Sequence, residues 1–165
     1  MLRVGDQAPD FEGISGEGKP IRLRDFIGRK VVLCFYPKNG TMGCTSAACG
    51  IRDTWAGFEE AGIQVIGVSG DSVESHQKFS SKNDLPFSLV SDRSREILFT
   101  YGAWRRGMKR VSRKTPIAAE RMTFLIDESG KIIKIYRRPI PGSHGKKILD
   151  FFAEFQKDLA QNTDL

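Results

Sequence analysis

The sequence lacks any apolar run long enough to cross a membrane, and among its 165 residues it has only three cysteines and two histidines. A membrane-spanning helix needs about 20 consecutive apolar residues, and the first residues, Met-Leu-Arg-Val-Gly-Asp, lack the apolar core of a signal peptide. Three cysteines are too few for a disulfide framework, so we expect them to be catalytic, redox-active or buried in a reducing compartment. These absences favour a cytoplasmic protein.

The scarcity of histidine also argues against a metal site. Zinc sites combine Cys and His at characteristic spacings. Neither His76 nor His144 stands at such a spacing from Cys44 or Cys49. We therefore expect no metal ion, and we expect His76 either to pack on its helix or to be solvated there.

Basic residues outnumber acidic ones, and much of the excess lies in one segment. The chain has 26 Lys and Arg against 20 Asp and Glu, for a formal net charge of +6. The segment is residues 105–114, Arg-Arg-Gly-Met-Lys-Arg-Val-Ser-Arg-Lys. A basic patch can bind an acidic partner such as nucleic acid, but no aromatic or base-reading motif accompanies this one. We interpret it as a solvated basic loop.

Composition and patterning predict one α/β domain over residues 1–165. A hydrophobic content of 39% and a charged content of 28% are typical of a soluble globular protein. Strand and helix signals alternate along the chain, and strand–helix–strand crossovers followed by a hairpin predict a central mixed β-sheet covered by helices on both faces. Expected strands lie at about 8–12, 31–36, 63–69, 87–91, 122–126 and 131–136; expected helices lie at about 41–60, 72–82, 94–101 and 148–159, with a frayed end at 161–165.

One stretch stands out chemically. Residues 37–49, Pro-Lys-Asn-Gly-Thr-Met-Gly-Cys-Thr-Ser-Ala-Ala-Cys, follow the most strand-like run of the sequence and precede a helical pattern in which Ile51, Trp55 and Phe58 share one face. Cys44 therefore falls in the first turn of a helix, where unpaired backbone N–H groups and the helix dipole favour a thiolate. This position predicts a reactive cysteine.

The residues alone leave other interpretations of the cysteines open. Cys44 and Cys49 are separated by four residues instead of the two of a Cys-x-x-Cys pair, and cysteines on one helix can be ordinary small core residues. Thr41 lies one helical turn before Cys44, where its hydroxyl can reach the sulfur or what the sulfur attacks, and Pro37 fixes the entry to the turn. We expect Cys34, in the middle of a strand, to be buried and structural.

The pattern Pro37-x3-Thr41-x2-Cys44 resembles the active-site signature of peroxiredoxins. The longer stretch 35–53 is similar to the bacterioferritin-comigratory, or Q-type, branch of that family. The similarity continues through three further blocks: Val-Ser-Gly-Asp-Ser-Val-Glu-Ser-His at 68–76, Leu-Pro-Phe-Ser-Leu-Val-Ser-Asp at 85–92, and Arg-Met-Thr-Phe-Leu-Ile-Asp at 121–127. Together the blocks cover most of the chain.

This resemblance implies a thioredoxin-like fold and a thiol-dependent peroxidase that reduces hydrogen peroxide and organic hydroperoxides without a metal or an organic cofactor. It implies that Cys44 is the peroxidatic cysteine and becomes a sulfenic acid, which Cys49 resolves as an intramolecular disulfide. A dithiol such as thioredoxin would restore the thiols, in a monomer or a homodimer. Thr41 and Arg121 would complete the catalytic site. The remaining residues of the expected substrate pocket are Tyr36, Pro37 and Gly43.

Two positions depart from the branch. Met42 stands where the branch usually has proline, which is preorganised for helix entry, and Ala47 stands where glutamate is common. Both changes bear on rate and partner preference, and neither removes a reacting atom. Two alternative functions stay open: a thiol–disulfide oxidoreductase that is inert towards peroxide, and a redox-sensing module that binds nucleic acid through residues 105–114.

An intact helix cannot carry a disulfide between Cys44 and Cys49. Residues five apart on an α-helix are separated by about 7.5 Å of rise, which gives a Cα–Cα distance of roughly 8–9 Å. A disulfide needs Cα atoms within about 7 Å. We therefore predict that part of the segment 41–51 unwinds after oxidation, and that Gly43 and Gly50 make this less costly.

Overall fold

The computed structural model describes residues 1–104 and 119–163, so the basic segment 105–114 lies outside the described residues. Its strands form one sheet in the order β2-β1-β5-β4-β3-β6-β7. The strands are β1 (Glu12–Ser15), β2 (Pro20–Arg22), β3 (Lys30–Phe35), β4 (Ile63–Ser69), β5 (Ser88–Ser91), β6 (Met122–Ile126) and β7 (Ile132–Arg137). The helices are α1 (Met42–Asp53), α2 (Trp55–Glu60), α3 (Val73–Asn83), α4 (Glu96–Thr100) and α5 (His144–Thr163), with short 3-10 turns η1 (Leu23–Phe26) and η2 (Pro141–Ser143).

The sheet is mixed, as the sequence predicts. Strands β3, β4 and β5 are parallel at its centre, whereas the outer pairs are antiparallel. Parallel neighbours need crossover connections. Helices α1 and α2 connect β3 to β4, and α3 connects β4 to β5. The predicted hairpin is β6 and β7.

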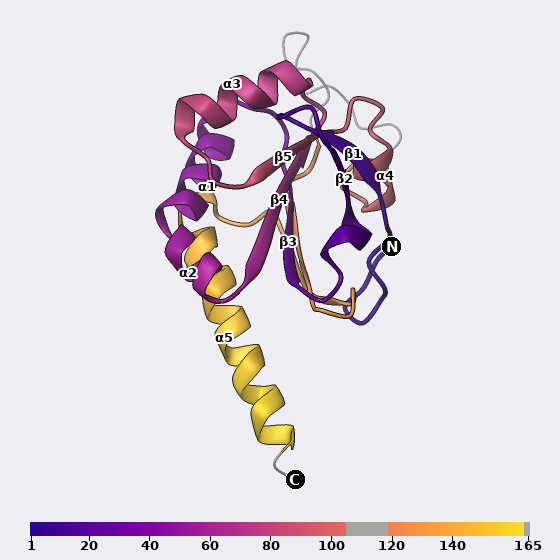
Figure 1. The fold of residues 1–165 in the computed structure, drawn as a ribbon, viewed down its shortest axis with the longest axis vertical. Coiled ribbons are helices and arrows are strands. Elements are labelled where there is room, and N and C mark those ends of the chain that lie inside the picture. Colours follow the sequence, from indigo (N-terminus) through magenta and orange to yellow (C-terminus); the bar gives the residue numbers. More distant parts are fainter. Residues whose placement is uncertain (105–118, 164–165) are drawn as a thin grey trace.

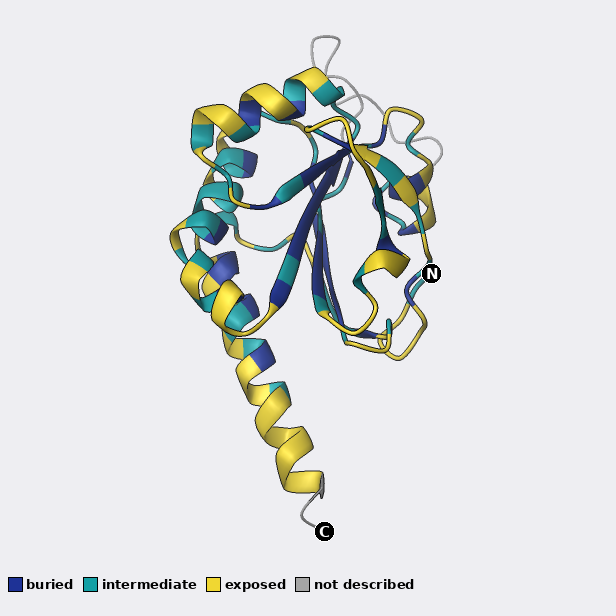
Figure 2. Ribbon diagram, in the orientation of Figure 1, coloured by how far each residue is buried: buried dark blue, intermediate teal, exposed yellow. Residues whose placement is uncertain are grey.

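Helices cover both faces of the sheet, which confirms the predicted fold class (Figure 1). Helices α1, α2, α3 and α5 lie on one face, and α4 and η1 lie on the other. Successive residues of a strand point to opposite faces. Along β3, Leu33 and Phe35 therefore join the cluster under α4, and Val32 joins the cluster under α1. The central strands are the most deeply buried part of the molecule (Figure 2).

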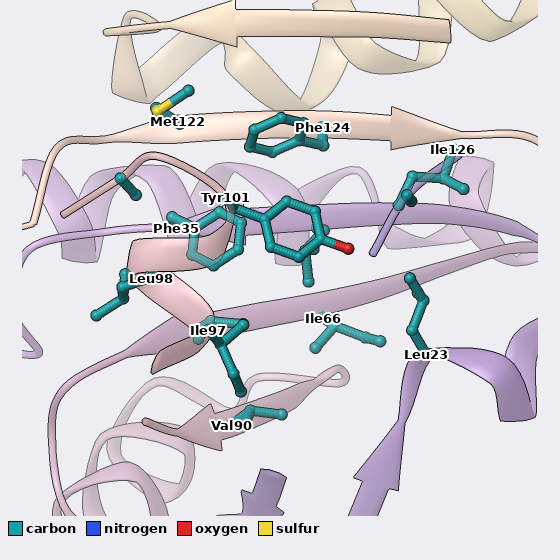
Figure 3. Packing of buried hydrophobic residues seen from close by; sticks show 14 of the residues in the cluster. Leu23, Phe35, Ile66, Val90, Ile97, Leu98, Tyr101, Met122, Phe124 and Ile126 are labelled. Atoms are coloured by element: carbon teal, nitrogen blue, oxygen red, sulfur yellow. The ribbon is translucent and has the colours of Figure 1, made fainter. Parts of the chain in front are cut away.

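Aromatic packing ties β3 to β6 beneath α4. The ring of Tyr101 lies with its centroid 5.2 Å from that of Phe35 on β3 and 5.1 Å from that of Phe124 on β6, and Figure 3 shows the three rings together. The Tyr101 hydroxyl donates a hydrogen bond to the Pro9 carbonyl. Two strands held side by side in this way fix the relative positions of the segments that leave their ends.

The predicted continuous helix over residues 41–60 is wrong, because the chain breaks it at Thr54. This residue has φ −108° and ψ 15° and separates α1 from α2. Its hydroxyl donates to the carbonyl oxygen of Gly50, at 2.9 Å. Such back-bonding by threonine competes with the regular helical ladder and bends helices. Within α2, after the break, Trp55 stacks on Phe58 with ring centroids 5.9 Å apart.

The other predicted ends of helices and strands agree with the structure in part. Gly62 has φ +69° directly after α2, as expected for a glycine stop, and Ser72 caps α3 by accepting a hydrogen bond from the Ser75 N–H. The expected extended piece at 8–12 is wrong in position, since β1 begins only at Glu12. The expected fraying from Gln161 is also wrong up to Thr163, where α5 ends, and residues 164–165 lie outside the described residues. In the part of the chain that the structure describes, no helix combines the length and apolarity that a membrane crossing requires.

Candidate active site

Cys44 lies in the first turn of α1, as predicted. Thr41, the residue before α1, is the helix N-cap, with φ −72° and ψ 150°. Its hydroxyl oxygen accepts a hydrogen bond from the Cys44 N–H at 3.3 Å. A threonine cap satisfies one of the donors that every helix N-terminus leaves unpaired. It also fixes the backbone of Cys44 relative to the loop that leaves β3. The side chain of Cys44 is buried, whereas Thr41 is exposed.

The Arg121 guanidinium contacts the sulfur of Cys44. Arg121 directly precedes β6, and the β3–β6 register pairs Phe35 with Met122, so Arg121 lies beside the end of β3. Its Nη2 donates to Cys44 Sγ at 3.4 Å. A cation at this distance stabilises negative charge on the sulfur or on an oxygen that the sulfur attacks.

A second donor of the same guanidinium remains free. Arg121 Nη1 is buried and has no hydrogen-bond partner among the described residues. A buried donor without a partner costs about 1–3 kcal/mol. This N–H group is therefore available to an oxygen atom of a ligand that enters beside Cys44.

Gly43 allows this approach. A Cβ atom at this position would lie 2.8 Å from Arg121 Nη2, closer than real Cβ contacts. The absence of a side chain at Gly43 thus lets the guanidinium reach the first turn of α1. The structure brings Thr41, Gly43, Cys44 and Arg121 together, and all four are expected site residues.

An apolar pocket extends beneath α1 from the same sulfur. Cys44 and Arg121 lie on its wall, and its other walls come from α1, α3, the sheet and the segment before α5. Its apolar lining includes Ala48, Ile51, Phe79, Phe87, Leu89 and Pro139. Ala47 also lines this pocket. The glutamate common in the related branch would place a carboxylate on this wall, so the alanine keeps it apolar.

His144 is a polar residue of this pocket that the sequence analysis missed. It begins α5, is buried, and places Nε2 2.8 Å from the hydroxyl oxygen of Thr123. Burial, and then the charges of Lys147 and Arg121, lower the pKa of His144 from 6.5 to about 4. The ring is therefore neutral at neutral pH. Its Nδ1 has no hydrogen-bond partner among the described residues.

Cys34 is chemically distinct from Cys44. It lies on β3, where the Thr123 hydroxyl donates to its sulfur at 3.8 Å. Burial raises the pKa of Cys34 from 9.0 to about 11, against a smaller lowering by the Thr123 hydrogen bond. Cys34 therefore remains a thiol at neutral pH, and a thiol is a poor nucleophile.

The structure does not bring Cys49 to Cys44. Both residues lie in the unbroken helix α1, and all three cysteines are free thiols. The half-buried Cys49 donates from Sγ to Asn83 Oδ1 at 3.7 Å. Arg52 Nη1 donates to the backbone carbonyl of Asn83 at 2.6 Å. The second half of α1 is thus fastened to the end of α3.

The other two expected pocket residues lie where β3 ends. The Tyr36 ring lines the pocket, but its hydroxyl donates to Asn39 Oδ1 at 2.7 Å. That hydroxyl also lies 3.3 Å from His76 Nδ1. Pro37 follows half-buried. Of the two expectations for His76, packing and solvation, packing is the one that holds, because the side chain is completely buried. Among the residues that the structure describes, no group of His, Cys, Asp or Glu is gathered as a metal site.

Comparison with known proteins identifies the family. Residues 4–135 match the model of the AhpC/TSA family. A putative peroxiredoxin bcp of Coxiella burnetii is 40% identical over 148 residues, which is 90% of this chain and 97% of that protein. The peroxiredoxin Bcp of Bacillus subtilis is 40% identical over 137 residues, which is 83% of this chain and 86% of that protein.

Solved structures agree with the sequence relatives. A PrxQ mutant of Xylella fastidiosa superimposes with a TM-score of 0.85 at 26% identity, over 94% of this chain and 98% of that one. The bacterioferritin comigratory protein of Xanthomonas campestris gives a TM-score of 0.80 at 29% identity, over 88% of this chain and 91% of that one. These neighbours confirm the predicted thioredoxin-like fold and the predicted peroxidase activity. The chain belongs to the AhpC/TSA family and is a peroxiredoxin related to the Bcp, or Q-type, proteins.

Proposed function

We propose that Cys44 carries out the peroxidase reaction of this chain. Its thiolate attacks the terminal oxygen of a hydroperoxide, the O–O bond breaks, and the sulfur becomes a sulfenic acid. The leaving oxygen takes up a proton and departs as an alcohol, or as water when the substrate is hydrogen peroxide. The sulfur loses two electrons and the peroxide gains them, so this step needs no further reactant.

The contact between Arg121 and Cys44 carries this proposal. A guanidinium N–H 3.4 Å from the sulfur and a second, unpaired N–H on the same group supply donors for the attacking sulfur and for the departing oxygen. Donors preorganised in this way typically contribute a few kcal/mol to the transition state. The Thr41 hydroxyl accepts from the Cys44 N–H and donates to the Lys38 carbonyl, so it holds the turn that carries the sulfur.

The apolar pocket supports organic hydroperoxides as substrates in addition to hydrogen peroxide. Its wall beside Cys44 is built from aliphatic and aromatic side chains, which suit an alkyl group better than water. The structural study of the Xanthomonas campestris relative names alkyl peroxide reduction as the activity of that protein. We extend this substrate class to the present chain.

The cycle closes through Cys49. Its thiolate attacks the sulfur of the Cys44 sulfenic acid, the S–O bond breaks, and the oxygen leaves as water with the formation of a disulfide. A dithiol such as thioredoxin then reduces this disulfide and is itself oxidised. Since both cysteines lie in the intact helix α1, the first turns of that helix must unwind for the sulfurs to meet.

The intramolecular disulfide needs no second copy of the chain, so a monomer suffices for the cycle. Recycling by a dithiol requires a reducing compartment, and we therefore place the protein in the cytoplasm. We also infer that residues 1–165 form one domain, because every described strand joins the same sheet.

A thioredoxin-coupled assay with hydrogen peroxide and an alkyl hydroperoxide tests these roles. We expect no turnover in Cys44→Ser, and in Cys49→Ser a single oxidation of Cys44 without a disulfide. Cys34→Ser serves as the matched control and should keep nearly full activity, since its thiol is inert. Peroxide turnover in Cys44→Ser would refute the assignment of the reactive cysteine.

A further inference from the structure

A buried polar cluster lies between the loop before Cys44 and helix α3. At its centre His76 of α3 is completely buried. Its Nδ1 lies 3.0 Å from Asn39 Nδ2 and 3.3 Å from the Tyr36 hydroxyl. Buried polar groups need partners, and the partners of Nδ1 come from the segment that leads from β3 to Cys44.

The hydrogen bonds of Asn39 indicate which nitrogen of the His76 ring carries the proton. The Tyr36 hydroxyl donates to Asn39 Oδ1, so the Asn39 amide nitrogen is the group that faces Ser75 Oγ, at 3.1 Å, and His76 Nδ1. An amide nitrogen can only donate, so in this arrangement Nδ1 of His76 is the unprotonated acceptor. The proton of the neutral ring then sits on Nε2, which lies 3.4 Å from Ser69 Oγ.

The backbone of the same loop residue is held as well. The N–H of Asn39 donates to Asp71 Oδ2 at 2.9 Å, and this carboxylate also accepts from the Ser69 hydroxyl at 2.6 Å. Burial lowers the pKa of His76, although Asp71 opposes this shift. The Tyr36 hydroxyl and the Asp71 carboxylate are the ionisable groups that face the cluster. Asn39 is therefore bonded at its side-chain oxygen, its side-chain nitrogen and its backbone.

We propose that His76 is a positioning residue for Cys44: through Nδ1 it holds Asn39, and through Asn39 it holds the loop that carries the Thr41 cap. This inference rests on the proposed role of Cys44. Asn39 precedes Thr41 by two residues, and Thr41 bonds to the Cys44 N–H. A loosened Asn39 would release the cap and displace the sulfur from Arg121. Loss of the His76 bond should therefore slow peroxide attack, and it should not slow the later disulfide step, which requires this turn to open.

The pair His76→Asn and His76→Gln tests the role of Nδ1. The side-chain oxygen of asparagine can occupy the place of Nδ1 and accept from Asn39, whereas glutamine extends towards the place of Nε2. We expect stopped-flow oxidation of Cys44 by hydrogen peroxide to stay within about threefold of the wild type in His76→Asn and to slow by about tenfold in His76→Gln, since tenfold corresponds to one lost buried hydrogen bond. Packing alone predicts the opposite order, because asparagine leaves the larger cavity.

Two further measurements separate positioning from general destabilisation. In reduced His76→Gln, amide exchange should rise across residues 38–45 and stay unchanged in β4, and the disulfide step should be as fast as in the wild type or faster. Gln77→Ala, an exposed neighbour on α3, is the matched control and should match the wild type. Should the His76 variants fail to fold, Asn39→Ala removes the His76 contact from the loop side, together with the bonds to Tyr36 and Ser75, and should slow oxidation at least as much.

Equal oxidation rates in His76→Asn and His76→Gln, or rates that simply follow the melting temperatures, would overturn the inference. Asn39→Ala at the wild-type rate would do the same. These outcomes differ from failure of the proposed function, in which Cys44 of the wild-type protein would itself not be oxidised.

Discussion

A methyl group added at Gly43 should slow the oxidation of Cys44 without lowering the stability of the protein. The Cβ of Gly43→Ala would lie 2.8 Å from Arg121 Nη2, where ordinary contacts begin at 3.4 Å, so the guanidinium must retreat by about 0.6 Å. The arginine side chain is flexible enough to do so. Arg121 Nη2, which now lies 3.4 Å from Cys44 Sγ, then moves away from the sulfur.

The two effects of this substitution have opposite signs. Alanine is more favourable than glycine in a helix by up to about 1 kcal/mol, and by less in the first turn, so the free energy of unfolding should be unchanged or slightly higher. A misplacement of about 1 Å can slow a reaction by roughly a hundredfold. For a shift of about half that size we expect Cys44 oxidation to slow by about tenfold.

Stopped-flow oxidation by hydrogen peroxide measures the rate, and urea titration measures the stability. Ser46→Ala is the matched control, because it also adds helix propensity in α1 but at an exposed position. It should leave the rate unchanged. A Gly43→Ala protein that is as stable as the wild type and oxidises Cys44 equally fast would show that the position of Arg121 does not matter for attack.

Other perturbations should have distinct signatures. Arg121→Met should slow Cys44 oxidation in stopped-flow by tenfold to hundredfold, since a hydrogen bond to a charged group contributes about 1.5–3 kcal/mol; an unchanged rate would contradict this. The pKa of His144 is lowered to about 4, so the unfolded chain binds more protons, and the free energy of unfolding should fall as the pH drops from 6.5 towards 4, by at most about 3 kcal/mol. His144→Gln should flatten part of that slope in urea titrations at several pH values, and an identical slope would argue against the assignment. Oxidation of the wild type should give a Cys44–Cys49 disulfide by peptide mapping with faster amide exchange over residues 41–51, whereas a bond through Cys34 or between chains would exclude Cys49 as the resolving residue.

Local signals in the sequence predicted much of the fold because they act over a few residues. The position of Cys44 at a helix start, the Ser72 cap and the Gly62 stop each depend on one turn of chain. The break at Thr54 was missed because threonine is an acceptable residue within a helix, and the bonds of its hydroxyl to the Gly50 and Ile51 carbonyls cannot be predicted from residue type alone.

Contacts between distant residues could not be predicted from local pattern. Arg121 lies 77 positions after Cys44, and the β3–β6 register brings it to the sulfur. The sequence placed Arg121 in the site only through the family resemblance. No such signal marked His144 or the contact of Asn39 with His76, since an isolated polar residue in a sequence does not reveal which buried group it will meet.

The proposed reaction requires α1 to be intact in one step and partly unwound in the next. The contacts of α3 with α1 and with the loop before it are compatible with both steps. Attack on peroxide requires the first turn of α1 to stay helical and in contact with Arg121. The bonds of Asn39 to Asp71 and His76, beside the start of α3, hold it in that position. Disulfide formation requires Cys49 to leave Asn83, and the bond between them, 3.7 Å from Sγ to Oδ1, is weak because a thiol is a poor donor. Arg52, three residues later, holds the same Asn83 at 2.6 Å. The Arg52–Asn83 bond is stronger than the Cys49–Asn83 bond and lies after Cys49 in the chain. Unwinding should therefore stop before Arg52 and be confined to the turns of α1 between Asn39 and Arg52.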